Sequence, residues 1–138
     1  MAAVIDLRFL AEDIRIYYPL RGELPAELLV SGGLHESLLP RLSQEPLIRV
    51  AKLHGQVIGA YLSIEVSSQV HRLEALAVLA PFRRRGIGSW LVGHALGVSE
   101  TRGARTCLAR ANTEADGLFR RLGFQHEEDQ WVMRIDPE

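Results

Sequence analysis

One stretch near the middle of the chain constrains the fold more than any other. It reads HRLEALAVLAPF over residues 71–82 and continues as RRRGIG over residues 83–88. The middle of the first part is too apolar for a surface strand, so we expect a central strand of a sheet, ended by Pro81. A helix is expected over residues 86–103, because the apolar residues there recur at helical spacing. A basic loop that contains glycine therefore joins a buried strand to the start of a helix.

Hydrophobic periodicity and turn residues predict the remaining elements. Prolines and glycines cut the helical pattern of residues 11–42 into short helices. A further short helix is expected over residues 113–122, with Asn112 as its N-cap. The other predicted strands are residues 3–10, 47–53, 57–66 and 104–111, followed by a closing hairpin around residues 127–130.

The order of these elements predicts the fold class. It runs strand, two helices, three strands, helix, strand, helix and two strands. This order indicates a mixed α/β (α+β) fold, with a central, mostly antiparallel sheet of about seven strands flanked by about four helices. The length predicts a single domain over residues 1–138.

The composition argues against several classes of function. The formal net charge is −1, so no overall basic field indicates nucleic acid or an anionic membrane surface as a partner. The longest clean apolar run, residues 75–82, is too short to span a bilayer. The single cysteine, Cys107, leaves no internal disulfide and no multi-cysteine metal site, and the histidines show no metal-ligand pattern. Since the first residues also lack a secretory signal, we expect a cytoplasmic protein without a metal site.

The loop over residues 84–89 has the composition of a phosphate-binding turn. The first turn of a helix leaves backbone N–H groups without partners, and the helix dipole places partial positive charge there. Glycine allows the backbone angles that turn successive N–H groups toward an anion. The loop is not a P-loop, and Leu91 stands where the third glycine of G-x-G-x-x-G would be. Two interpretations stay open at this point: a pyrophosphate site, or a helix start with a solvated basic turn.

Two motifs in this order resemble the GNAT superfamily, the acetyl-CoA-dependent N-acetyltransferases. LAVLAPFRRRGIGSWLV is similar to the family's core motif Arg/Gln-x-x-Gly-x-Gly/Ala, here Arg83-x-x-Gly86-x-Gly88. The segment from Asn112 to Phe124 resembles the family's Asn-x-x-Ala-x-x-Leu-Tyr-x-x-x-Gly-Phe. The resemblance covers about residues 47–135 and implies the GNAT fold, in which the strand before the core motif carries a bulge and splays from the next strand.

The resemblance also implies how acetyl-CoA, the cosubstrate, is held. The backbone of Leu76, Ala77 and Val78 would pair with the pantetheine arm, and the N–H nearest Val78 would face the thioester oxygen. Asn112 would contact the cofactor near its arm. Arg83, which begins the core motif, is a further cofactor-binding candidate. The residues that would form the pyrophosphate loop are Arg84, Arg85, Gly86, Ile87, Gly88 and Ser89.

The candidate general base is Glu74, on the strand that carries the thioester contact. Its apolar sequence neighbours suggest a raised pKa, which suits general-base work, directly or through water. The alternatives are a charged side chain on the solvent-facing side of the strand, or a carboxylate paired with Arg72 or another arginine. His71 is a weaker candidate, and a lone strand cysteine such as Cys107 is more typical of buried packing than of an acetylated intermediate.

Phe119 is a cofactor-binding candidate that departs from the family pattern, because it stands where the family often has a tyrosine. Without a hydroxyl it has no proton to give to the leaving thiolate. Three explanations stay open. Water or another side chain supplies the proton; the thiolate leaves without help; or the domain binds acetyl-CoA and turns it over slowly.

The predicted activity is transfer of the acetyl group of acetyl-CoA to a primary amine, by direct attack in a ternary complex. The alternative is an acetyl-CoA-binding regulatory or sensor module with little or no turnover. The acceptor is a small-molecule or protein amine; an acidic excess in residues 11–45 and 127–129 would suit a cationic one, against the alternative of ordinary solvated surface. The resemblance also allows a homodimer.

Overall fold

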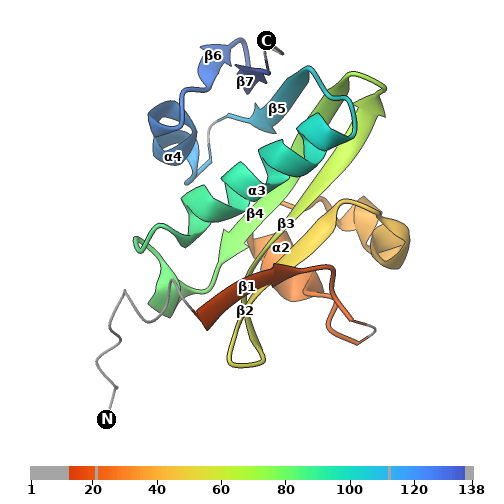
Figure 1. Cartoon of the computed structure of the whole chain (residues 1–138), viewed down its shortest axis with the longest axis vertical. Helices are drawn as coiled ribbons and strands as arrows, with labels where there is room; N and C mark the ends of the chain where they lie inside the picture. Colours follow the sequence, from red (N-terminus) through yellow and green to blue (C-terminus); the bar gives the residue numbers. More distant parts are fainter. Residues whose placement is uncertain (1–12, 21, 112, 136–138) are drawn as a thin grey trace.

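A seven-stranded sheet runs through the computed structural model, which describes residues 13–20, 22–111 and 113–135 (Figure 1). The strand order is β1-β2-β3-β4-β5-β7-β6, and every neighbouring pair is antiparallel except β4 and β5. The predicted fold class is confirmed. The strands are β1 (Ile14–Tyr17), β2 (Ile48–Leu53), β3 (Gln56–Ser67), β4 (Val70–Val78), β5 (Thr106–Arg110), β6 (Gln125–Glu127) and β7 (Gln130–Arg134).

Helices cover both faces of the sheet, with α3 in front of β3 and β4 and α2 behind them in Figure 1. The helical elements are α2 (Ala26–Ser31), α3 (Ile87–Thr101) and α4 (Asp116–Arg121), with 3-10 segments η1 (Glu36–Gln44) and η2 (Ala80–Phe82). Leu91 of α3 packs in one buried cluster with Ile58 and Tyr61, and Leu29 of α2 packs in another with Ala60 and Leu62. These β3 residues divide between the two clusters because the middle of this strand is buried on both faces. Within the described ranges, no helix is long and apolar enough to cross a membrane.

The N-terminal region differs from the prediction. Residues 14–17 were expected in a helical segment, but they form β1 at the edge of the sheet, with Ile14 opposite Leu53 of β2. Ile14 and Ile16 alternate with polar or amphipathic residues, and Ile14 is buried against α3. Burial against a distant element thus decides the conformation of a segment whose local pattern is ambiguous. The predicted strand at residues 3–10 lies outside the described residues.

The start of α4 also differs from the prediction. The helix begins at Asp116 rather than at Thr113, after Ala115, which provides no side-chain cap. Thr113 and Asp116 form a turn of their own instead, because the Thr113 N–H donates to Asp116 Oδ1 and the Ala115 N–H donates to Thr113 Oγ1. Asn112, the predicted N-cap, lies outside the described residues. Short polar side chains that bond to nearby backbone groups in this way delay the first helical turn.

Strands β4 and β5 pair over only part of their length. The register runs from Val70 opposite Thr106 to Leu73 opposite Ala109, whereas β4 continues to Val78. The pairing of β3 with β4 shifts register at this place, which leaves Glu74 as an extra residue in β4. Such a bulge bends the strand that carries it. We call the point beyond the Leu73–Ala109 pair, where β4 is no longer bonded to β5, the fork.

Candidate active site

Beyond the fork, the backbone of β4 presents N–H groups on the side away from β3. The Leu79 N–H donates to the Ile58 carbonyl at 2.8 Å, so it faces β3. Because N–H directions alternate along a strand, those of Leu76 and Val78 face the opposite side. The Leu76 N–H donates to the Gly32 carbonyl at 3.3 Å. The Val78 N–H has no acceptor among the described residues, and it is therefore the open donor at this end of β4.

The loop after β4 has the backbone geometry of an anion site. Arg84 and Gly86 adopt left-handed conformations, with φ of 60° and 83°, and Gly86 immediately precedes α3. The first helical hydrogen bond runs from the Trp90 N–H to the Gly86 carbonyl, at 3.1 Å. In the described part of the chain, no backbone N–H from Arg84 to Ser89 donates to a protein acceptor. These free donors and the positive end of the α3 dipole coincide, which favours a bound anion.

The three arginines of the loop lie differently from one another. The Arg83 Nε donates to the Val78 carbonyl at 2.9 Å, and the Arg85 Nε donates to the Pro81 carbonyl at 3.4 Å. Both side chains therefore reach back and hold the loop against the end of β4 and η2. The Arg84 side chain has no partner among the described residues, so it is the one free to contact a ligand.

The remaining loop residues place α3 in the fold. The Ile87 side chain is buried in the cluster that contains Leu91, which leaves only its backbone for a ligand. A Cβ at Gly88 would lie 3.3 Å from Leu118 Cδ2, so a glycine lets the first turn of α3 approach α4 closely. Ser89 is partly exposed in this first turn.

Glu74 is buried at the fork, but its surroundings are not the apolar ones that its sequence neighbours suggested. Only 5% of its side chain is exposed, and Oε1 accepts a hydrogen bond from Arg72 Nε. Oε2 lies 3.9 Å from Arg110 Nη2. The sequence alternative of pairing with Arg72 is therefore present, since residues two apart share one face of a strand. Arg110 was not predicted, because it comes from β5, on the other side of the fork.

The C-terminal end of α2 lies across the fork. The Gly32 carbonyl accepts from the Leu76 N–H of β4, and the Gly33 carbonyl accepts from Arg110 Nη1 at 3.4 Å. A Cβ at Gly32 would lie 2.3 Å from the Leu76 oxygen and 2.8 Å from Ala77 Cβ. Only glycine permits this approach. The consecutive glycines were the sequence signal for it, although they were interpreted only as helix breakers.

The side chain of Phe119 belongs to a buried cluster beside the fork. It is 3% exposed, and its ring lies 5.1 Å from that of Phe124, centroid to centroid, at an interplanar angle of 57°. The same cluster contains Ala109 and packs against Leu73 and Leu76. The position carried over from the family pattern is therefore near the fork, but the ring itself is packed. Asn112, the other candidate in this segment, lies outside the described residues.

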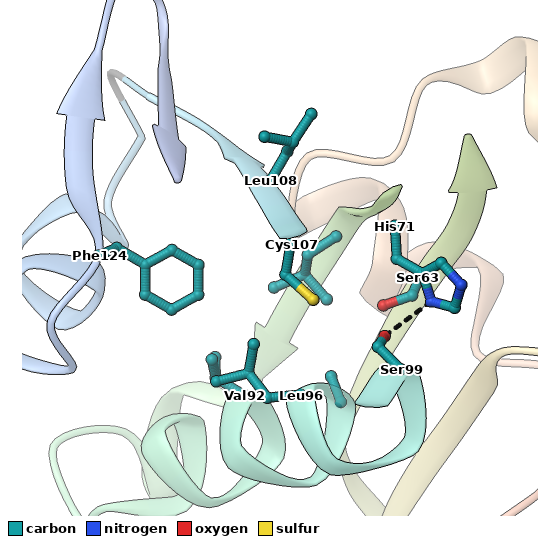
Figure 2. Close-up of a pocket in the computed structure, with 10 residues that line it drawn as sticks. Ser63, His71, Val92, Leu96, Ser99, Cys107, Leu108 and Phe124 are labelled. Carbon is teal, nitrogen blue, oxygen red and sulfur yellow. Dashed lines mark hydrogen bonds between the residues drawn. The ribbon is translucent and has the colours of Figure 1, made fainter. Parts of the chain in front are cut away.

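A second polar group lies before the fork, where β4 and β5 are still paired. Figure 2 shows His71 of β4 bonded to Ser99 of α3, with Nδ1 2.8 Å from Oγ, at a cavity of about 10 Å³ that Cys107 also lines. Burial lowers the pKa of His71 and raises that of the Cys107 thiol. A thiol of raised pKa is a poor nucleophile, in agreement with a packing role for Cys107. Neither residue reaches the fork.

Comparison with known proteins relates these features to a family. Residues 10–124 match the family described as Acetyltransferase (GNAT) family. An uncharacterized N-acetyltransferase of Chlorobaculum tepidum is 29% identical over 109 residues, which cover 75% of this chain and 69% of that protein.

Solved structures share the fold at lower sequence identity. A GNAT family acetyltransferase from Elizabethkingia anophelis with acetyl-CoA bound has a TM-score of 0.77 and 16% identity, over 89% of this chain and 99% of that one. An IAA acetyltransferase from Bacillus cereus has a TM-score of 0.74 and 21% identity, over 88% and 99%.

Proposed function

Because the chain belongs to the acetyltransferase (GNAT) family and is an acetyl-CoA-dependent N-acetyltransferase, we propose that acetyl transfer takes place at the fork, by direct attack of a primary amine in a ternary complex. This proposal rests on two structural features that lie next to each other. Strands β4 and β5 separate after Leu73 and Ala109, and β4 leads through η2 and a short loop to the N-terminus of α3, where the backbone N–H groups are unpartnered.

The residues around the fork fit acetyl-CoA, which supplies an activated acetyl group when bound. The backbone from Arg84 to Ser89 would hold the pyrophosphate, and the free Arg84 guanidinium would add charge to it. The backbone of residues 76–78 would receive the pantetheine arm. Arg83 and Arg85 would act through the shape of the loop, since their side chains bond to the end of β4 and η2.

The Val78 N–H would stabilise the negative charge that develops on the carbonyl oxygen as the amine attacks. It is the open donor on β4, because the Leu76 N–H is bonded to Gly32. A backbone donor fixed in a sheet needs no rearrangement during the reaction, which is the property that makes such groups effective. The fork holds both reactants in one slot, which adds the advantage of proximity.

Glu74 would accept the proton of the attacking amine, directly or through water. Its carboxylate is buried at the fork, and Arg72 fixes its position. Phe119 offers no proton to the leaving thiolate. A thiol with a pKa of about 8.5 leaves readily as the anion, so water is a sufficient proton source in this proposal.

Two measurements test the proposed function. Calorimetric titration with acetyl-CoA should show binding, and release of free thiol should follow when a panel of primary amines is added. Absence of acetyl-CoA binding would overturn the proposal. Binding without turnover on a broad panel would favour the sensor alternative instead.

A further inference from the structure

We propose that the acceptor carries a carboxylate close to its amine, and that Arg110, with Arg72, binds this carboxylate at the fork. This inference rests on the proposed function and specifies the substrate class of the same site. It is carried by the arrangement of two guanidinium groups and one buried carboxylate on the side of the fork that α2 covers.

The charges of the side chains at the fork do not cancel. Arg72 and Arg110 both approach Glu74, which carries a single negative charge. The three side chains together therefore retain one positive charge. Glu74 is almost fully buried, whereas 44% of the Arg72 side chain and 59% of the Arg110 side chain are exposed. The uncompensated positive charge is thus on the solvent side of the cluster.

Arg110 keeps hydrogen-bond donors available for a ligand. A guanidinium group has five N–H donors. Those of Arg110 make two long contacts, at 3.9 Å to Glu74 and 3.4 Å to the Gly33 carbonyl. Neither has the short, paired geometry of a guanidinium–carboxylate pair, in which two parallel hydrogen bonds form. Arg110 is positioned by these contacts but is not saturated by them.

Part of the acidic excess that the sequence offered to a cationic amine is neutralised by ion pairs within the chain. The acidic excess of residues 11–45 and 127–129 was considered as a site for a cationic amine. Several of these acids have cationic partners of their own: Glu23 pairs with Lys52, Glu45 with Arg41, and Glu127 with Arg134. The charge that remains at the fork therefore favours an anionic group on the acceptor.

The geometry of an amino acid suits this arrangement. Its carboxylate and its amine are attached to the same carbon, so a carboxylate held by Arg110 keeps the amine at the fork. Glu74, which Arg110 also contacts, is the proposed proton acceptor for that amine. A guanidinium group selects a planar carboxylate over a neutral amide, because only the carboxylate accepts two charge-assisted hydrogen bonds.

The test compares free amino acids with their own carboxamides. Each pair presents the same side chain and amine, and differs in the carboxylate. Rates of thiol release from acetyl-CoA should favour the free acid over its carboxamide. Arg110→Gln should raise the KM for the free acid roughly 10- to 100-fold, because the charge-assisted hydrogen bonds to the carboxylate are lost and the neutral amide replaces them only in part. The KM for acetyl-CoA should stay unchanged.

Two further variants make the result specific. Arg110→Lys keeps the charge but removes the planar guanidinium group, so it should recover only part of the affinity for the free acid that Arg110→Gln loses. Arg134→Gln is the matched control. Arg134 is also an exposed strand arginine paired with a carboxylate, but it lies opposite Thr106, at the other end of β5. This variant should keep the full preference for the free acid.

The outcomes separate this inference from the function on which it rests. A preference for the free acid that is lost in Arg110→Gln and kept in Arg134→Gln supports the inference. Equal use of acid and carboxamide, or a preference that Arg110→Gln leaves intact, overturns it. So does failure to acetylate any free amino acid when acetyl-CoA still binds. Failure of the unaltered chain to bind acetyl-CoA overturns the proposed function as well.

Discussion

The carbonyl oxygen of Gly32 accepts a hydrogen bond from the Leu76 N–H at 3.3 Å, and this contact joins the end of α2 to β4 immediately beyond the fork. It has two consequences. It closes one side of the proposed acceptor site, and it occupies the donor next to Val78. The one contact thus determines which N–H of β4 is open to the thioester.

Gly32→Ala should destabilise the protein by about 1–3 kcal/mol, the usual cost of forcing a group into a packed site. The new Cβ would lie 2.3 Å from the Leu76 oxygen, so α2 must move away from β4. Chemical denaturation measures the change in the free energy of unfolding. Gly93→Ala is the control: it has open space at an exposed position of α3 and should stabilise by about 0.5–1 kcal/mol. Equal effects of the two variants would contradict the packing described.

Gly86→Val should weaken acetyl-CoA binding strongly, because a β-branched residue is a poor fit to φ of 83° and would distort the loop. Gly86→Asn is the matched variant. Asparagine tolerates the left-handed conformation far better, and the site has open space for its Cβ. We expect calorimetry to give a dissociation constant at least about tenfold higher for valine than for asparagine, given a strain of about 1–3 kcal/mol. Similar affinities would mean that the loop conformation is not needed for binding.

Glu74→Gln should lower kcat by about 10²–10⁴, the range typical of a lost general base. The amide retains the size of the side chain and an oxygen that can accept from Arg72, so acetyl-CoA affinity should be unchanged. Steady-state thiol release and calorimetry on the same preparation separate the two effects. A kcat within a few-fold of the original would remove Glu74 from the proposed chemistry and leave it as the partner of the two arginines.

Phe119→Tyr should destabilise the protein by about 1–3 kcal/mol without accelerating acetyl transfer. Its ring is packed against Phe124 in a buried cluster, so an added hydroxyl would be buried and would have to find a hydrogen-bond partner. Thermal denaturation and thiol release measure the two expectations. A faster reaction would show instead that a phenol at this position can reach the leaving thiolate.

The free energy of unfolding should fall as the pH is lowered below about 6.5, the ordinary pKa of histidine. Burial lowers the pKa of His71 and of His94, so the folded chain binds fewer protons than the unfolded chain in this range. The contribution of these histidines to the free energy of unfolding is therefore fully present above their unfolded pKa, and it is lost as the pH falls toward their folded pKa values. Denaturation between pH 7 and pH 5 should show a shallower decline for His71→Gln. An unaltered pH dependence would mean that His71 does not titrate in this way.

Much of the fold follows from local sequence patterns. The apolar strand that Pro81 follows, the arginine–glycine loop and the long helix after it are all found where periodicity and turn residues predict them. These features depend on neighbours along the chain, and backbone conformation responds to them directly. Local sequence patterns also identified the loop whose free N–H groups support the proposed pyrophosphate site.

The tertiary structure decided what lies around Glu74. The apolar neighbours of this residue in sequence suggested an apolar site, but its actual neighbours are Arg72, two residues away on the same strand, and Arg110 at the end of β5. Likewise, pairing with β2 makes residues 14–17 a strand. Strands β4 and β5 are separated along the chain by all of α3, and their parallel pairing brings Arg110 to the fork. The sequence by itself determined the loop and the elements beside it, because local backbone preferences suffice for them; the charge around the reacting groups arises from long-range pairing, which local patterns do not encode.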